Sequence, residues 1–289
     1  MKIIVWDLPE LQSTYLKINC IKYFENGEIC IMTPESAMEV YADINAGKLA
    51  AKEIIVISQN PVILKESVAA GMITVAYQPP IDVAGAAGVT REAFPQVDMV
   101  IEGFEEVDYD FLKKIYQRYH GLPWTILETD RLVVRELELK DMDALFELYS
   151  YEGMTDYMEG LYSFEEEYEY QKAYIENMYC FFGYGMWLVF EKESGKLIGR
   201  AGVEHREELE GELELGYAIG TPWQGMGYAT EVCRGILDYV REELGFEEII
   251  SLVQPENALS IRLLEKLRFK EDEEIILEGI CYKKYKKTL

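Results

Sequence analysis

Two glycines between a strand-like run and a helical run constrain the fold of this chain more than any other feature. Gly225 and Gly227 lie in residues 223–231, after an apolar run at 213–219 and before a helical pattern that continues to about residue 243. Glycine lets a backbone approach a phosphate closely, and a helix start offers free N–H groups and the positive end of the helix dipole. The stretch therefore predicts an anion site that suits a pyrophosphate, with a simple tight turn as the alternative.

The composition is that of a folded protein without a membrane segment. The chain has 289 residues, enough for two domains, and its 49% hydrophobic content can form a sizeable core. No apolar run reaches the roughly 18 residues of a membrane span, and the first residues turn polar too early for a signal peptide. Five cysteines and two histidines indicate free thiols and argue against a histidine-rich metal site. We therefore expect a cytoplasmic protein with no metal centre and no membrane contact.

The net charge of −25 is divided unevenly along the chain. Residues 1–124 hold 10 basic and 17 acidic side chains, whereas residues 125–289 hold 18 and 36, which is a net charge of −18. Nucleic-acid partners require basic surfaces, so this composition argues against them. The same charge favours cationic ligands such as amines or basic peptides, unless it serves only solubility.

The first half alternates short apolar runs with helical patterns. Strands are expected at residues 2–8, 28–33, 53–58, 72–77 and 99–102, helices at 34–46, 61–70 and 110–119, and a loop at 82–95. Such alternation is typical of a parallel sheet with helices on its faces, as in a Rossmann-like α/β domain. No G-x-G-x-x-G follows any of these strands, which argues against a dinucleotide site.

Several segments of this half resemble the haloacid-dehalogenase (HAD) superfamily. The first strand is similar to the motif that carries the family's nucleophilic aspartate, here Asp7, and residues 32–33 and 55–75 resemble two later motifs. The motif's second aspartate corresponds to Pro9, and the acidic metal ligands correspond to residues 58–60, which are Ser-Gln-Asn. A phosphatase of this kind needs a carboxylate cluster for Mg²⁺ and an acid for the leaving group. The resemblance therefore implies an inactive HAD-like domain, with an active Asp7 or an unrelated flavodoxin-like sheet as the alternatives.

Residues 121–124, Gly-Leu-Pro-Trp, interrupt the pattern and mark a domain boundary. We therefore expect a first domain at 1–122 and a second at 125–289. In the second, strands are expected at 129–136, 186–191, 197–204, 212–219, 248–253, 274–277 and 281–284. Helices are expected at 139–149, from 163, up to about 243, and after residue 260 through Ile261, Leu264 and Leu267. Twelve aromatic residues between 151 and 187 are expected mainly in the core, with the wall of an acceptor pocket as the alternative. The carboxylates among them are expected mostly on a solvated face.

The motifs of the second half resemble, in the same order, those of the GNAT acetyltransferases. Residues 224–229, Gln-Gly-Met-Gly-Tyr-Ala, fit the Q/R-x-x-G-x-G/A signature with which that family holds the coenzyme A pyrophosphate, and residues 257–269 resemble its last conserved helix. Together with residues 129–132, 199–202 and 214–217, these motifs look like the ribosomal-protein N-terminal acetyltransferase subgroup. The resemblance implies a mixed-sheet α/β acyltransferase domain that uses acetyl-CoA. One departure is Arg268, where a glycine is usual.

The resemblance also implies which residues contact the cofactor. They are Tyr217, Ala218, Ile219, Gln224, Gly225, Met226, Gly227, Tyr228, Ala229, Thr230, Asn257 and Ser260. The strand at 212–219 would offer backbone groups to the pantetheine arm, and Asn257 would bind the pantetheine or orient a water.

Acetyl transfer to an amine needs an oriented thioester, removal of a proton from the amine, and donors for the developing oxyanion. Glu214 is the first candidate base, with a solvated strand carboxylate as the alternative, and Glu204 on the neighbouring strand is the second. His205 could titrate near neutrality, although a structural role is the simpler interpretation. The tyrosine that protonates the departing thiolate in many relatives corresponds to Leu264. Ser260 therefore becomes the candidate acid, or else a helix-cap or first-turn serine.

These observations predict acetyl-CoA-dependent N-acetylation of a primary amine by direct transfer. The acceptor would be a protein N-terminus or a small cationic amine, and a homodimer is compatible with the sequence. Two other functions stay open. One is a non-catalytic acyl-CoA sensor whose first domain docks a partner, and the other is a bifunctional protein with a residual HAD phosphatase.

Overall fold

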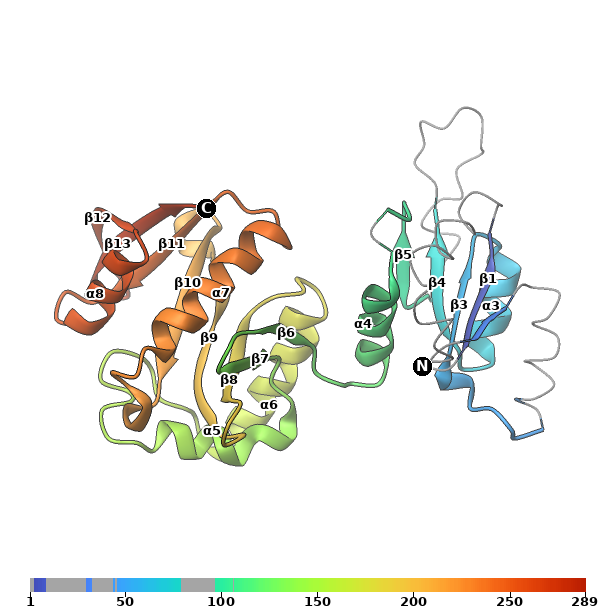
Figure 1. Cartoon of the computed structure of the whole chain (residues 1–289), viewed down its shortest axis with the longest axis horizontal. Coiled ribbons are helices and arrows are strands. Elements are labelled where there is room, and N and C mark those ends of the chain that lie inside the picture. Colours follow the sequence, from blue (N-terminus) through green and yellow to red (C-terminus); the bar gives the residue numbers. More distant parts are fainter. Residues whose placement is uncertain (1–2, 9–29, 33–43, 45, 79–96, 106) are drawn as a thin grey trace. The chain divides into compact units, whose positions relative to one another are not determined.

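The computed structural model describes residues 3–8, 30–32, 44, 46–78, 97–105 and 107–289. It divides the chain into two compact units, Met1–Leu122 and Pro123–Leu289 (Figure 1). The helix expected at residues 34–46 lies mostly outside the described residues, and the loop expected at 82–95 lies wholly outside them.

The first unit contains a parallel sheet, as the alternating pattern predicts. Its strands are β1 (Ile3–Asp7), β2 (Cys30–Met32), β3 (Ile54–Ser58), β4 (Ile73–Tyr77) and β5 (Met99–Ile101), in the order β2-β1-β3-β4-β5. All described pairs are parallel. The helices are α3 (Pro61–Ala69), which Asn60 caps, and α4 (Tyr109–Tyr119), which Asp108 caps. A short 3-10 turn, Ala51–Glu53, precedes β3. Every residue of β3 and β4 is buried, as expected of strands covered on both faces.

The second unit is built on an eight-stranded mixed sheet. Its strands are β6 (Thr125–Glu128), β7 (Leu132–Arg135), β8 (Met186–Glu191), β9 (Leu197–Arg206), β10 (Glu212–Ile219), β11 (Glu248–Val253), β12 (Lys270–Leu277) and β13 (Ile280–Thr288). The order is β12-β13-β11-β10-β9-β8-β7-β6, and only β10 and β11 are parallel. This is the mixed sheet that the sequence predicts for the second half.

Helices cover both faces of this sheet. They are α5 (Met142–Tyr149), α6 (Phe164–Tyr174), α7 (Tyr228–Glu242) and α8 (Ala258–Lys266), with short turns at Leu139–Asp141, Ile175–Tyr179, Glu207–Leu209 and Thr221–Trp223. Figure 1 shows α7 lying across β9 and β10, and the ring of Tyr239 packs on the fully buried Trp187 of β8. Trp187 pairs in register with Ala201 of β9, and side chains alternate between the two faces of a strand. The residues on either side of Ala201 therefore point to the opposite face of the sheet, toward α5 and α6. Arg200 accordingly bonds Tyr149 of α5, and Glu204 bonds Tyr174 of α6.

Two expectations for the second unit are wrong in detail, and one of the carboxylates expected mostly on a solvated face is an exception. The strand expected at 129–136 begins only at Leu132 (β7), because Thr129 N–H bonds the carbonyl of Leu132 (2.9 Å) and closes a turn, and the strand before that turn, β6, was not expected. The last two strands are longer than expected, because β12 and β13 pair from Lys270 opposite Lys286 to Leu277 opposite Ile280. Glu167 is 2% exposed rather than solvated, since it accepts hydrogen bonds from Tyr162 N–H and Gln171 Nε2.

Candidate active site

The parallel strands β10 and β11 pair at one position, Glu214 opposite Ile250, and then diverge. Beyond that rung, side chains replace backbone pairing: Ser251 Oγ donates to the carbonyl of Leu215 (3.0 Å), and Leu252 N–H donates to Glu214 Oε1 (3.2 Å). The two strands therefore form a fork that opens toward their carboxyl ends.

The edge of β10 that faces the fork has backbone groups available for a ligand. The Leu215 carbonyl points toward β11, because Ser251 of that strand donates to it. Strand alternation then turns the backbone groups of Tyr217 and Ile219 the same way. The Ile219 carbonyl is occupied by Gln224 Nε2 (3.0 Å). The Tyr217 N–H and carbonyl and the Ile219 N–H are thus placed to meet an extended, amide-containing ligand.

The glycine stretch lies at the open end of the fork, where β10 leads through a short turn into α7. Gly225 (φ +75°) and Gly227 (φ +86°) both have left-handed backbones, which strain any residue with a Cβ. Gly227 is the N-cap of α7 and supplies no side chain to the first helical N–H groups. A Cβ on Gly225 would meet no described protein atom within 4 Å. The stretch is therefore a cradle of free N–H donors at the positive end of α7, as a phosphate site requires.

Several side chains of the stretch hold the loop rather than face a ligand. Gln224 braces it through the Ile219 carbonyl, and Tyr228 is buried with its hydroxyl donating to Glu191. Met226 accepts Arg131 Nη1 on its carbonyl (3.1 Å), and Thr230 Oγ1 accepts Lys266 Nζ (3.4 Å) from α8. The groups that these residues have left for the cofactor are their backbone N–H groups, the hydroxyl of Thr230 and the exposed side chain of Met226.

Arg131 is a component of the cradle that sequence reasoning did not select as a site residue. Its Nε and Nη2 bond Glu231 Oε2 at 2.7 and 2.6 Å, and its guanidinium lies 4.3 Å over the ring of Tyr228. Glu231 also accepts hydrogen bonds from Thr129 Oγ1 (2.5 Å) and Arg131 N–H (3.0 Å). Burial opposes ionisation of Glu231, but these hydrogen bonds prevail and lower its pKa. The only sequence signal for Arg131 is its place in the motif at 129–132.

Glu214, the first candidate base, is at the closed end of the fork. It is 7% exposed and is held by the guanidinium of Arg206 and by Leu252 N–H. Burial raises the pKa of Glu214, and Arg206 opposes that rise. A solvated carboxylate, the alternative interpretation, is therefore wrong for this residue. A buried carboxylate with a raised pKa is a suitable proton acceptor.

Glu204, the second candidate, lies directly opposite Glu214 in the antiparallel pair of β9 and β10. Both side chains therefore point to the face covered by α5 and α6. The hydroxyl of Tyr174 donates to Glu204 and accepts Met186 N–H (2.7 Å). Burial raises the pKa of Tyr174 well above its usual range, and Glu204 raises it further. Glu204 is thus engaged by a protonated tyrosine, which leaves Glu214 as the better placed of the two.

The start of α8 brings the other candidates to the fork. Asn257 is the N-cap of α8 through its Oδ1, which accepts Ser260 N–H (3.1 Å), and its amide nitrogen is the group left for a ligand. Ser260 is therefore a first-turn residue and not the cap. The hydroxyl of Tyr217 donates to the Ser260 carbonyl (3.3 Å). Burial raises the pKa of Tyr217 above its usual range. The Leu264 side chain is fully buried.

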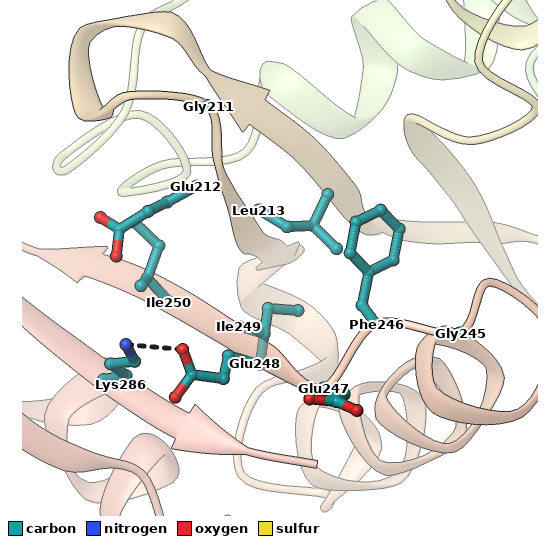
Figure 2. Close-up of a pocket in the computed structure, with 10 residues that line it drawn as sticks. All are labelled: Gly211, Glu212, Leu213, Gly245, Phe246, Glu247, Glu248, Ile249, Ile250 and Lys286. Atoms are coloured by element: carbon teal, nitrogen blue, oxygen red, sulfur yellow. Dashed lines mark ion pairs between the residues drawn. The ribbon is translucent and has the colours of Figure 1, made fainter.

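Two other features do not belong to this site. His205 Nδ1 lies 2.7 Å from the Gly211 carbonyl, and its ring packs near Phe246, consistent with a structural role. An open hollow of about 440 Å³, shown in Figure 2, lies between the amino-terminal starts of β10 and β11, where Lys286 pairs with Glu248 (2.8 Å). The cradle follows the opposite end of β10. Within the described part of the chain, no three His, Cys, Asp or Glu side chains are grouped to hold a metal ion.

Comparison with known proteins agrees with this geometry. The profile of the family described as "Acetyltransferase (GNAT) domain" matches residues 131–270. The chain belongs to the GNAT acetyltransferase family. It is 30% identical over 147 residues to the "Uncharacterized N-acetyltransferase p20" of Bacillus licheniformis, covering 50% of this chain and 83% of that protein. It is 31% identical over 145 residues to the "Uncharacterized protein YkkB" of Bacillus subtilis (strain 168), covering 50% and 84%.

Among solved structures, the second unit shares its fold with RimL, a ribosomal L7/L12 alpha-N-protein acetyltransferase. The identity is 15%, the TM-score is 0.51, and the match covers 58% of this chain and 96% of RimL. A second RimL structure, in complex with coenzyme A, matches at a TM-score of 0.50 and 16% identity. The protein is therefore an acyltransferase, and acetyl-CoA is its acetyl donor. No described helix combines the length and apolarity needed to cross a bilayer.

Proposed function

We propose that this enzyme transfers the acetyl group of acetyl-CoA directly to a primary amine at the fork between β10 and β11. The observation that carries the proposal is the alignment of three parts: the glycine cradle, the open edge of β10 and the buried Glu214 at the closed end. The cradle fits a pyrophosphate because it combines two left-handed glycines with an uncapped helix start. When bound, acetyl-CoA supplies an activated acetyl thioester.

Each group of the fork then has one role. N–H groups of the cradle at residues 227–230 hold the pyrophosphate, and the Tyr217 and Ile219 backbone groups align the pantetheine amides. Glu214, directly or through a water, takes the proton that the amine must lose before it attacks. A backbone N–H of β10 donates to the carbonyl oxygen as it gains negative charge. Ser260, in the first turn of α8, donates a proton to the sulfur as the C–S bond breaks, and Asn257 Nδ2 binds the pantetheine.

Calorimetry with acetyl-CoA tests the cradle. Gly227→Glu places a carboxylate where a phosphate would bind and should abolish acetyl-CoA binding. Gly245→Glu adds the same charge at the other end of α7, also at a left-handed glycine (φ +72°), and should leave binding intact. Binding that survives Gly227→Glu would remove the basis of the proposal. Release of free thiol in the presence of an amine panel then separates an acetyltransferase from a binding protein that turns nothing over.

We further propose that the first unit is a HAD-like domain without phosphatase activity. Supporting this, β1 pairs with both β2 and β3, which places Asp7 at the carboxyl end of a central strand, opposite Ser58 in register. Ser58 Oγ accepts Asn60 N–H (2.9 Å) and, unlike a carboxylate, adds no charge for a divalent cation. Mg²⁺-dependent cleavage of an aryl phosphate that Asp7→Asn abolishes would show instead that the domain is active.

A further inference from the structure

The guanidinium of Arg200, on β9, is partly buried and has no carboxylate partner among the described residues. Its Nη1 donates to the hydroxyl of Tyr149 (3.2 Å), and its Nε is buried with no hydrogen-bond partner. Among the described residues, none of the ion pairs includes Arg200, whereas Arg131, Arg135 and Arg206 each hold a carboxylate. A cation removed from water normally has an opposite charge beside it, because its desolvation is otherwise uncompensated.

The groups around Arg200 include Tyr149, Tyr174 and Tyr179, and the last two donate their protons to other acceptors. Tyr174 donates its hydroxyl proton to Glu204, and Tyr179 donates to the Met186 carbonyl (2.6 Å). The pKa of Tyr170 is raised, first by burial and then by Glu204, while Arg200 lowers it. The Tyr170 hydroxyl therefore senses the charges of both Arg200 and Glu204. These neutral hydroxyls surround the guanidinium without balancing its charge.

The sheet register places Arg200 on the same face as the candidate bases. Across β9 and β10, Arg200 lies opposite Ala218, Gly202 opposite Gly216, and Glu204 opposite Glu214. All six residues point toward the face that α5 and α6 cover, because strand side chains alternate. Gly216 and Ala218 are partly exposed. This face thus has a guanidinium at one end and two carboxylates at the other, with Ala218 and, over Gly216, the side chain of Met186 between them.

We infer that Arg200 binds a carboxylate of the acceptor, so that the acceptor is an amine with a carboxylate a few bonds away. This inference rests on the proposed function, because it assumes that the amine is at Glu214. Arginine matches a carboxylate with two parallel N–H donors. An acceptor with one ammonium and one carboxylate is neutral and enters the −18 field of the second half without repulsion. A polyamine would instead place a cation against Arg200. The required chemistry occurs in a free amino acid and at a peptide N-terminus with an acidic side chain.

The test uses linear ω-amino acids from glycine to 6-aminohexanoate, each paired with its primary amide, and measures thiol release from acetyl-CoA. One member of the series should exceed its amide by about tenfold or more in kcat/KM, since a hydrogen-bonded charge pair is lost in the amide. Arg200→Gln should remove this preference while the amide keeps its rate. Tyr149→Phe removes only the hydrogen bond to Nη1 and should keep the preference. A peptide series with aspartate or asparagine at the second position distinguishes the peptide source from the free amino acid.

Three results would overturn the inference. In the first, amides are acetylated as fast as acids; in the second, Arg200→Gln lowers both rates equally. If Arg200→Gln fails to fold, the acid-to-amide ratio of the native enzyme decides. If acetyl-CoA binds but no amine is acetylated, only the proposed function is contradicted. In that case the third overturning result is equal thermal stabilisation of the enzyme–CoA complex by the acid and its amide, which would exclude the carboxylate site.

Discussion

Arg131 and Glu231, 100 residues apart in the chain, form an ion pair of 2.6 Å between Nη2 and Oε2 at the start of α7. The pair explains how a carboxylate is tolerated in the helix turn that we propose binds the pyrophosphate. Glu231 alone would repel that anion, and Arg131 neutralises it while also bonding the Met226 carbonyl.

A double-mutant cycle tests this arrangement. Arg131→Met should weaken acetyl-CoA binding by about tenfold, because it exposes the phosphates to an unpaired Glu231. Glu231→Gln should bind as well as the native enzyme or better, and the double variant should recover most of the loss. Calorimetric dissociation constants provide the comparison. If the double variant binds as weakly as Arg131→Met, Arg131 acts by contacting the cofactor and not by neutralising Glu231.

Substitution of Gly227 should affect both protein stability and acetyl-CoA binding, and a comparison with Gly245 separates the two effects. At φ +86°, Gly227→Ala carries a left-handed backbone penalty of about 1–2 kcal/mol, although its Cβ would meet only Arg131 Nη2 at 3.5 Å. Gly245→Ala carries the same kind of penalty at φ +72°, with no described atom within 4 Å of the Cβ. We expect similar losses of thermal stability in both, and a rise in the KM for acetyl-CoA only in Gly227→Ala. Equal KM values in the two variants would contradict the cradle.

Glu214 gives the activity a pH dependence with a definite sign. The base works in its ionised form, so kcat should rise with pH as Glu214 loses its proton, at a pH above the ordinary glutamate value of 4.5 because burial raises the pKa. Arg206 stabilises the ionised form, so Arg206→Gln should move this acidic limb to higher pH. Glu214→Gln should lower kcat by about 10²–10⁴-fold.

Glu204→Gln is the matched control, because it changes the residue opposite Glu214 in the same strand pair. We expect it to keep the acidic limb but to move it slightly to lower pH, because the charge of Glu204 helps to raise the pKa of Glu214, and to lower kcat much less. If the pH profile of kcat lost its acidic limb in Glu204→Gln and kept it in Glu214→Gln, Glu204 and not Glu214 would be the general base.

The sequence predicted those parts of the fold whose signals are local. Strand β10 and the glycine cradle were predictable because an apolar run, two glycines and a helical pattern are neighbours in the chain. Strand β3 was predictable from four consecutive apolar β-branched residues, Ile54–Ile57, which are buried. The existence of α8 was predictable from the amphipathic run through Ile261, Leu264 and Leu267, but its start was not, because the cap is Asn257 and the helix already includes Ser260.

The features that could not be predicted depend on distant partners. The strand expected from Thr129 starts only at Leu132, because a turn forms where Glu231 of α7 bonds Thr129 and Arg131. The fork arises because β10 and β11 share one rung, and strand composition does not encode where pairing stops. Glu167 is buried by Tyr162 and Gln171, although its acidic neighbours along α6 are solvated. Each of these outcomes is set by tertiary contacts rather than by local pattern.

Ser260 should affect turnover more than cofactor affinity. Ser260→Ala removes the proposed proton donor to the thiolate and should lower kcat by about tenfold or more, with the KM for acetyl-CoA nearly unchanged. Tyr217→Phe is the informative comparison, because the Tyr217 hydroxyl donates to the Ser260 carbonyl and stays protonated at neutral pH. If Tyr217→Phe loses more kcat than Ser260→Ala in steady-state thiol-release assays, the tyrosine is the acid and Ser260 is only a first-turn residue.

Arg268 offers a stability prediction that is independent of catalysis. It follows α8 at φ +66°, where Arg268 N–H bonds the Glu265 carbonyl (2.9 Å) and Phe269 N–H bonds the Leu264 carbonyl (2.9 Å). This is a Schellman ending, whose left-handed position favours glycine. Arg268→Gly should therefore raise the free energy of unfolding of the second unit by about 0.5–1 kcal/mol.

Glu265→Gly, an exposed substitution inside α8, should lower that free energy by about the same amount. Urea titration followed by tryptophan fluorescence suits the measurement, because Trp124, Trp187 and Trp223 all belong to the second unit. Both variants should keep the native kcat, since neither changes the start of α8 where Asn257 and Ser260 lie. A loss of stability in Arg268→Gly would mean that the arginine side chain contributes more than its backbone strain costs.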